Sequence, residues 1–250
     1  MFLGLTTVPS VSCAPSTNPD SYKISREQMV KNDIKGRGIH DHVLLEAMLE
    51  VPRHLFSGPE NIEAAYSDSA LPIKENQTIS QPYVVALMTT VAELSSTDKV
   101  LEVGTGSGYQ AAVLGKIVRE VYSIEIIETL ARESRELLNK LGYKNIHVKH
   151  GDGYRGWKEA APFDAILITA AAPKIPEPLL NQLKVGGRLV MPLGRSRAPQ
   201  ELIALTKTEN GLKKRVVTNV AFVPMTGEVR DVENDFIART KQKEKEALSE

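Results

Sequence analysis

The sequence predicts an α/β protein built on a doubly wound, mostly parallel sheet of seven strands. Three observations carry this prediction. Short apolar runs alternate with helical patterns from residue 99 onward, a glycine-rich turn follows the first of these runs, and Asn210-Gly211 joins two alternating runs near the end. Strands that alternate with helices form parallel sheets covered on both faces. An asparagine–glycine pair is a strong signal for an antiparallel hairpin, which here closes the sheet.

Helices and one long loop precede this alternation. Ser25 and Asp41 are candidate N-caps of two helices, the second of which ends at Val51 before a proline. The segment 58–82 is polar and loop-like, and long loops inside compact domains usually carry function. Pro82 is suited to open a further helix that runs to residue 94.

The alternating part of the chain gives the elements of the sheet. In order we expect strand 99–103, helix 108–117, strand 120–125, helix 128–141, strands 146–149 and 164–168, helix 176–183, strand 186–192, and hairpin strands 201–208 and 213–224. In open α/β sheets ligands bind at the carboxyl ends of the strands. The residues that follow each strand are therefore the first candidates for a site.

Composition describes an ordinary globular chain of 250 residues. Its 31 basic and 31 acidic residues balance, so charge gives no reason to expect a nucleic-acid or membrane partner. A single cysteine, Cys13, excludes an intrachain disulfide, and the five histidines have no metal-ligand spacing. We expect a cytoplasmic monomer without a metal.

Three parts are expected along the chain. Residues 1–14 are mildly apolar but lack the basic start and long apolar core of a signal peptide, so a remnant export signal or a lipid-anchored Cys13 are alternatives to a disordered segment. The expected parts are a flexible extension over 1–22, a single domain over 23–231 whose N-terminal helices and substrate loop occupy 23–82, and a charged C-terminal helix or tail over 232–250.

The segment 102–110, EVGTGSGYQ, is the most informative in the chain. Gly104, Gly106 and Gly108 surround Thr105 and Ser107 in a turn between a strand and a helix. Glycines let the backbone turn sharply and approach a ligand with no Cβ in the way. The helix start behind the turn offers free N–H groups to polar ligand atoms. The segment therefore predicts a nucleoside-type cofactor.

The glycine spacing separates two classes of cofactor. A dinucleotide fingerprint reads GxGxxG, whereas this turn reads GxGxG followed by Tyr109. Glu102 before the turn suits a positively charged amino-acid ligand better than a pyrophosphate. Glu125 ends the next strand at about the 20-residue distance of a ribose-binding carboxylate, with a glutamate in solvent as the plain alternative. S-adenosyl-L-methionine fits better than a nicotinamide cofactor, which stays the second choice.

Two more segments fall near the same edge of the sheet. Asp152 and Gly153 follow the third strand, where an aspartate can reach an adenine amino group, although Asp–Gly pairs are also common in ordinary turns. Ser80 stands just before the helix that Pro82 opens. It is either a plain N-cap or a hydroxyl that holds a substrate oxygen over the cofactor.

Several segments together resemble protein-L-isoaspartate O-methyltransferases of the bacterial type. The glycine turn is shared by many methyltransferases, whereas TISQP with the late VPMTG is far more specific to this family. The resemblance runs from about residue 28 to 231. Its segments are QTISQP at 77–82, EVGTGSGYQ at 102–110, GDG at 151–153, APFDA at 161–165, AAAP at 170–173, GGRLV at 186–190 and FVPMTG at 222–227.

The resemblance implies a Rossmann-like methyltransferase fold and a specific reaction. A methyl group passes from S-adenosyl-L-methionine to the free α-carboxylate of L-isoaspartyl residues in damaged peptides and proteins, which initiates their repair. Ser80 is then the active-site residue. The residues implied to bind the cofactor are Thr78, Ile79, Ser80, Glu102, Gly104, Thr105, Gly106, Gly108, Glu125, Asp152, Gly153 and Thr226. Tyr154 and Trp157 depart from residues common in the family.

The chemistry agrees with what the chain lacks. A carboxylate acceptor is ionised near neutral pH and needs no general base, and the sequence has no obvious Cys–His or Ser–His–Asp set. The segments 58–82 and 222–230 are the expected walls for an extended peptide.

Two alternative functions stay open. A nucleic-acid N-methyltransferase would carry an Asn/Asp-Pro-Pro-aromatic segment where 169–173 reads TAAAP, and a noncatalytic binding module is compatible with the fold alone.

Overall fold

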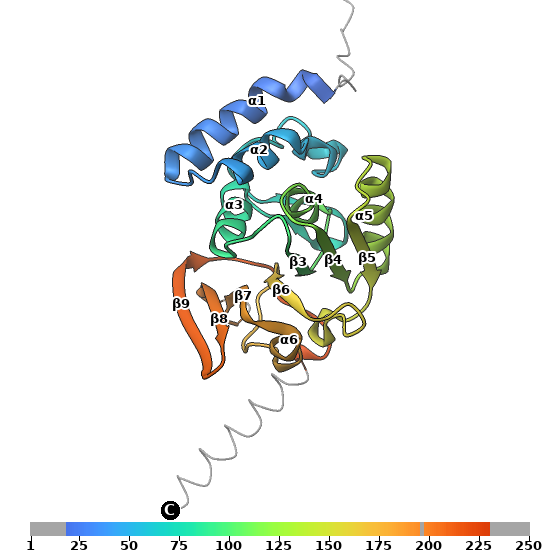
Figure 1. Ribbon diagram of the computed structural model, residues 1–250. Coiled ribbons are helices and arrows are strands. Elements are labelled where there is room, and N and C mark those ends of the chain that lie inside the picture. Colours follow the sequence, from blue (N-terminus) through green and yellow to red (C-terminus); the bar gives the residue numbers. More distant parts are fainter. Residues whose placement is uncertain (1–18, 196–197, 231–250) are drawn as a thin grey trace, which may run out of the picture.

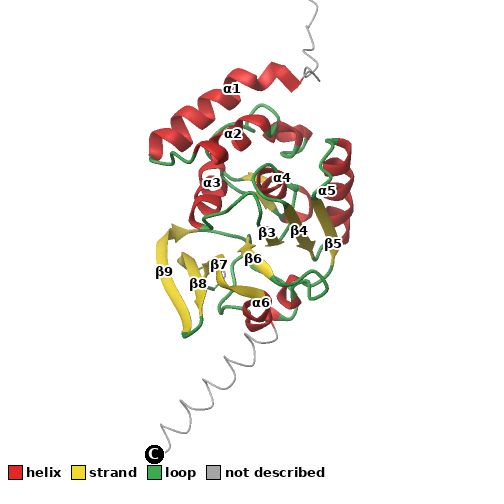
Figure 2. Ribbon diagram, in the orientation of Figure 1, coloured by secondary structure: helices red, strands yellow, loops and turns green. Residues whose placement is uncertain are grey.

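A computed structural model describes residues 19–195 and 198–230 of the chain. It forms a twisted sheet with helices on both faces (Figures 1 and 2). The predicted extension up to residue 18 and the predicted C-terminal tail over 232–250 lie outside the described residues. Every helix in the described ranges is too short or too polar to span a bilayer.

The main sheet has seven strands in the order β5-β4-β3-β6-β7-β8-β9. The first five in this order are parallel, and β8 and β9 add an antiparallel hairpin, so the predicted fold class is confirmed. The chain runs from β3 to β4 and β5 on one side, then crosses to β6 on the other, which makes a switch point beside β3. The strands are β3 (Lys99–Val103), β4 (Glu120–Glu125), β5 (Ile146–His150), β6 (Phe163–Ile168), β7 (Leu183–Leu193), β8 (Gln200–Thr208) and β9 (Gly211–Val220).

The helices lie close to their expected places, with one exception at the N-terminus. Asp41 caps α2 as expected, because its Oδ1 accepts the N–H groups of Val43 at 3.0 Å and Leu44 at 3.3 Å. Ser25 is not a cap: it lies inside α1, and helical turns begin already at Pro19–Tyr22 and continue to Lys35–Arg37. The helices are α1 (Lys23–Gln28), α2 (His42–Glu50), α3 (Pro82–Val91), α4 (Tyr109–Gly115), α5 (Glu128–Lys140) and α6 (Glu177–Gln182).

Two hydrophobic cores lie on the two faces of the sheet. Alternate residues of a strand point to opposite faces, so Val100 packs in one core and Leu101 in the other. The larger core joins the sheet to residues of α2, α3, α4 and α5, and the smaller one joins it to α6 and the segment around Met225 and Val229. The strands read as nearly continuous apolar runs because both of their faces are buried.

The predicted loop 58–82 contains a small hairpin that the sequence did not reveal. Strands β1 (Leu71–Pro72) and β2 (Thr78–Ile79) pair antiparallel and form a separate two-stranded sheet. We call residues 71–79 the strap. Its tip is fastened to α5, where Lys74 Nζ lies 2.8 Å from Glu133 Oε1 and Thr129 Oγ1 donates to Glu75 Oε1 at 2.9 Å.

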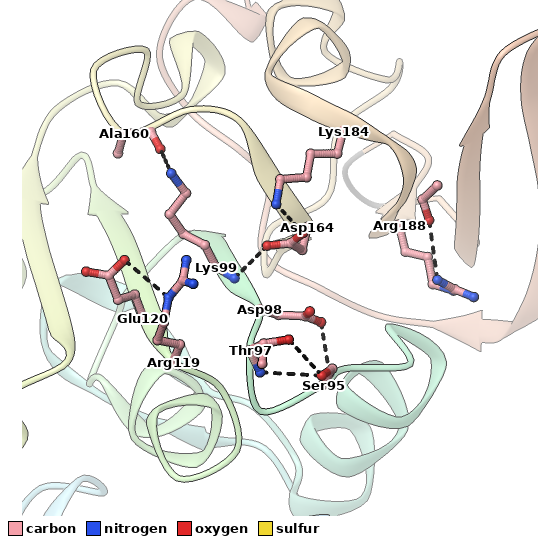
Figure 3. A network of polar contacts seen from close by, with 11 residues as sticks. Ser95, Thr97, Asp98, Lys99, Arg119, Glu120, Ala160, Asp164, Lys184 and Arg188 are labelled. Atoms are coloured by element: carbon pink, nitrogen blue, oxygen red, sulfur yellow. Dashed lines mark hydrogen bonds and ion pairs between the residues drawn. The ribbon is translucent and has the colours of Figure 1, made fainter.

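A polar network covers the amino end of the central strands (Figure 3). Asp164 accepts the backbone N–H of Lys99 at 2.8 Å and pairs with Lys184. Lys99 Nζ in turn donates to the Ala160 carbonyl. These contacts tie β3, β6 and β7 together at the end of the sheet opposite to the one where ligands bind. Substitutions in the network therefore serve as distant controls for the site.

Candidate active site

The glycine turn after β3 has the backbone conformation that its sequence predicts. Gly104, Gly106 and Gly108 have φ values of 101°, 53° and 88°, all in the left-handed region that favours glycine. A Cβ at Gly104 would lie 2.5 Å from Thr169 Oγ1. A Cβ at Gly108 would instead press on α5, 3.3 Å from Leu138 Cδ1, so this third glycine serves the packing of the helix.

Glu125 is fixed against the glycine turn at the end of β4. Its Oε2 accepts the Gly106 N–H at 2.8 Å, and its Oε1 accepts the Ile127 N–H at 2.9 Å. Only 5% of the residue is exposed, so the alternative of a glutamate in solvent is wrong. An ionised carboxylate has about four acceptor positions. Two are used here, which leaves Glu125 able to accept ligand hydroxyls.

Glu102 lies beneath the turn in the protein interior. The Ser123 hydroxyl donates to its Oε2, and Thr105 Oγ1 lies 2.6 Å from Ser123 Oγ. Its Oε1 has no hydrogen-bond partner among the described residues. Burial raises the pKa of Glu102 to about 8, with the Ser123 hydrogen bond opposing this rise and the charge of Glu125 adding to it. The side chain is therefore largely protonated at neutral pH.

A cavity opens at the carboxyl ends of β3, β4 and β6, where the switch point predicts a ligand. It holds about 880 Å³ of empty space, counting its open mouth, which is within the usual range for small-ligand pockets. Nine of the predicted residues line it: Thr78, Ile79, Ser80, Gly104, Thr105, Gly106, Glu125, Gly153 and Thr226.

Glu102, Gly108 and Asp152 do not line this cavity. Glu102 is buried against Ser123, and a Cβ at Gly108 would face α5. The Asp152 carboxylate accepts the N–H groups of Tyr154 at 2.9 Å and Glu228 at 2.8 Å, and it thereby fixes the chain beside Thr226. Direct contact of these three residues with a cofactor stays a prediction.

Ser80 has no structural task that would occupy its hydroxyl. Helix α3 begins at Pro82, and Gln81 occupies the N-cap position. Among the residues that the structure describes, the Ser80 hydroxyl has no hydrogen-bond partner, so the reading of Ser80 as a plain N-cap is wrong. The half-buried side chain lines the cavity instead.

A second cavity adjoins the first and shares Thr78 and Ser80 with it. The segment 58–82 contributes to its wall as expected, and Phe222 does so from the segment 222–230. The end of β9 was not expected there. The complete lining is Ala70, Thr78, Ser80, Gln81, Val84, Pro199, Asn219, Val220, Ala221 and Phe222.

Sequence reasoning missed several residues of the first cavity. Gln110 is 7% exposed, and its Nε2 donates to Thr89 Oγ1 at 3.0 Å, which fixes the amide on the cavity wall. Ile126 and Ile127 also line the cavity. Their position directly after Glu125 was a usable signal, because residues after a strand end fall at the ligand edge. Gln110 gave no such signal, since it lies in a helix whose register is fixed only in the fold.

Comparison with known proteins agrees with the geometry. The family model for protein-L-isoaspartate(D-aspartate) O-methyltransferase matches residues 24–230. Protein-L-isoaspartate O-methyltransferase 2 of Shewanella sediminis is 50% identical over 91% of this chain and 95% of its own length. Protein-L-isoaspartate O-methyltransferase 1 of Syntrophobacter fumaroxidans is 52% identical over 83% of this chain and 96% of its own length.

Two solved structures have the same fold. A protein-L-isoaspartate O-methyltransferase superposes with a TM-score of 0.75 at 29% identity, covering 82% of this chain and 67% of that one. A putative protein-L-isoaspartate O-methyltransferase from Plasmodium falciparum, solved with S-adenosyl-L-homocysteine, superposes with a TM-score of 0.70 at 28% identity, covering 80% and 98%. The glycine turn, the cavity behind it and these matches over most of the chain lead to one conclusion: this chain belongs to the protein-L-isoaspartate(D-aspartate) O-methyltransferase family.

Proposed function

We propose that this protein transfers a methyl group from S-adenosyl-L-methionine to the free α-carboxylate of L-isoaspartyl residues in damaged peptides and proteins, and that Ser80 positions the acceptor. One observation carries the role of Ser80. Within residues 19–195 and 198–230 its hydroxyl has no hydrogen-bond partner, and the residue lines both cavities. One cavity then holds the nucleoside, the other receives the peptide, and the reacting carboxylate lies between them.

The first cavity fits the cofactor by its donor set. The glycine turn offers a wall without side chains at Gly104 and Gly106, and Glu125 offers carboxylate oxygens to ribose hydroxyls. Gly153 and Thr226 lie on the same wall and complete the proposed contacts. The bound cofactor supplies an electrophilic methyl group. The nicotinamide alternative is excluded by the family to which the chain belongs.

The task left to the protein is alignment rather than proton transfer. A carboxylate acceptor is already ionised near neutral pH and is itself the nucleophile. The Ser80 hydroxyl donates a hydrogen bond to one carboxylate oxygen and leaves the other free to react. Holding the two reactants in line and keeping water away supplies the rate enhancement.

The second cavity supports an extended peptide as the substrate. An isoaspartyl residue reroutes the backbone through its side chain, so its α-carboxylate projects from the chain, and reading it requires contacts to the residues on either side. Apolar Val84, Val220 and Phe222, with the polar Asn219, offer such contacts without a charge requirement. A substrate of varied sequence is compatible with this lining.

The remaining expectations belong to the same proposal. We infer a monomer that acts in the cytoplasm, with neither nucleic acid nor membrane as a partner. Balanced charge over the chain supports the absence of a nucleic-acid partner, and the single cysteine is typical of proteins from reducing compartments.

Ser80→Ala tests the proposal. With an isoaspartyl peptide as acceptor, we expect turnover to fall by about 10- to 1000-fold, comparable to the loss of one positioned polar group. The affinity for adenosylhomocysteine, measured by calorimetry, should stay within about twofold. Ser95→Ala is the matched control, because this serine lies in the network at the opposite end of the sheet (Figure 3). Unchanged turnover in Ser80→Ala, or equal transfer to the normal aspartyl peptide, would contradict the proposal.

A further inference from the structure

The start of helix α3 raises the question of what keeps the Ser80 hydroxyl free. The first N–H groups of a helix need acceptors from outside the helix. Serine hydroxyls readily accept N–H groups two or three residues further along the chain. The Tyr83 N–H would therefore be the natural partner of Ser80. In the structure this N–H donates instead to Asp68 Oδ1, at 3.1 Å, from fifteen residues earlier in the chain.

Asp68 makes two further contacts around the same helix start. Its Oδ2 accepts from Gln81 Nε2 at 2.7 Å and pairs with Arg37 Nη1 at 2.7 Å. The Arg37 guanidinium lies 3.4 Å from the centre of the Tyr83 ring. One carboxylate, with 19% of its side chain exposed, thus holds the residues on both sides of Pro82. The segment that carries Ser80 enters α3 at a fixed angle as a result.

We propose that Asp68 is a positioning residue for Ser80, because it caps α3 in place of the serine and so leaves the serine hydroxyl for the substrate. The inference rests on the proposed role of Ser80. Without Asp68, the Tyr83 N–H is unpaired and the Ser80 hydroxyl is the acceptor nearest in sequence. A serine that turns toward this N–H no longer faces the junction of the two cavities.

Two substitutions at position 68 separate the cap from the charge. Asp68→Ala removes the acceptor, and we expect kcat with an isoaspartyl peptide to fall about tenfold while adenosylhomocysteine affinity stays within about twofold. Asp68→Asn keeps a side-chain oxygen for the Tyr83 N–H. Its NH2 group replaces the acceptor Oδ2, so the ion pair with Arg37 is lost and Gln81 must turn its amide to accept instead of donate. Exposed ion pairs contribute little to the stability of a fold, and 45% of the Arg37 side chain is exposed. The asparagine variant should therefore retain kcat within about threefold.

Asp41→Ala is the matched control for loss of a cap. Asp41 caps α2 with the same chemistry, by accepting two backbone N–H groups, and in the described part of the chain no hydrogen bond or ion pair joins it to α3 or Ser80. Loss of an N-cap costs about 1 kcal/mol of stability in either place. Both alanine variants should lose similar stability in urea unfolding, and only Asp68→Ala should lose kcat. An equal loss of kcat in Asp41→Ala would overturn the proposal.

A double-mutant cycle decides whether Asp68 acts through Ser80. In the Ser80→Ala background, Asp68→Ala should cost less than about twofold in kcat, because there is no hydroxyl left to misplace. A tenfold loss in both backgrounds, or no loss in either, would overturn the inference and leave the role of Ser80 intact. If Ser80→Ala alone has full activity, the proposed role of Ser80 fails and the inference fails with it.

A second variant covers the case in which Asp68→Ala does not fold. Gln81→Leu removes one contact of the carboxylate but leaves the cap on Tyr83 in place, and kcat is read at saturating peptide because Gln81 also lines the second cavity. We expect a loss of about threefold in kcat that disappears in the Ser80→Ala background. An equal loss in both backgrounds would count against the positioning role.

Discussion

Glu102→Gln should stabilise the protein, and the gain should grow as the pH rises. In the folded protein Glu102 is fully buried, and burial raises its pKa to about 8. In the unfolded chain the same side chain ionises with a pKa of about 4.3. Between these two values the folded state holds a proton that the unfolded state has released. Folding must therefore take up a proton, and this becomes harder as the pH increases.

The sign and size follow from this difference. A raised pKa contributes stability that is fully present below about pH 4.3 and is lost as the pH rises toward 8. One proton corresponds to about 1.4 kcal/mol for each pH unit, or roughly 3 kcal/mol between pH 5.5 and 7.5. This is roughly a fifth to more than half of the about 5–15 kcal/mol by which most domains are stable. Glutamine is nearly the same shape and releases no proton, so the variant lacks this pH dependence.

Urea unfolding at pH 5.5, 6.5 and 7.5 measures the effect. The unfolding free energy of the variant minus that of the original protein should rise by about 1.4 kcal/mol for each pH unit, on top of any constant offset from the amide. Glu136→Gln, an exposed position on α5, is the control and should give a difference that does not change with pH. A flat difference for Glu102→Gln would show that the buried carboxyl is ionised in the folded state, and would refute the reasoning.

Three further substitutions have expected outcomes. Gly104→Ala forces a side chain into a left-handed backbone and to within 2.5 Å of Thr169 Oγ1, so adenosylhomocysteine affinity should fall by at least about tenfold in calorimetry, and normal binding would contradict the role of the turn. Arg53→Lys replaces a fully buried guanidinium, whose Nε donates to the Ala65 carbonyl, by a side chain with a different donor geometry. The free energy of unfolding in urea should fall by about 2 kcal/mol, and an unchanged value would contradict a structural role of the guanidinium. Burial acts to raise the pKa of Asp164, but hydrogen bonds from Lys184 and a backbone N–H outweigh it and lower this pKa. The ionised carboxylate therefore stabilises the folded protein at neutral pH, and this contribution is lost as the pH falls through the folded-state pKa. Asp164→Asn should therefore cost less than about 1 kcal/mol at pH 7, since the lysine is half exposed, and the cost should shrink as the pH is lowered toward 3; an equal cost at both values would contradict this.

The sequence identified the sheet because its signals are local. Strands 99–103 and 120–125 were predicted with the bounds that the structure has, since apolar runs between polar turn residues mark buried strands. The glycines at 104 and 106 indicated the position of the site for the same reason, because glycine is the residue type that favours a left-handed backbone. The position of Glu125 followed from its place at a strand end.

What the sequence did not reveal depends on contacts between distant segments. The hairpin at 71–79 has strands of two residues, too short to show any periodicity. The N-cap alternative for Ser80 stayed open because serine is a common N-cap, and nothing in the local sequence shows that Asp68 already accepts the Tyr83 N–H. The burial of Glu102 beneath the turn was not visible either, because its hydrogen bond comes from Ser123, which lies 21 residues further along the chain.

The strap contributes to the wall of the first cavity and also leads directly into Ser80. Its residues 77–79 form part of the cavity wall, Ile73 reaches toward Gly106, and the next residue after the strap is Ser80. Because the backbone runs on without a break from Ile79 to Ser80, part of the wall of the first cavity and the residue that adjoins the second cavity are built on one segment. Two contacts at the tip of this segment fasten it to α5, so the nucleoside wall and the serine share one anchor on the far side of the glycine turn.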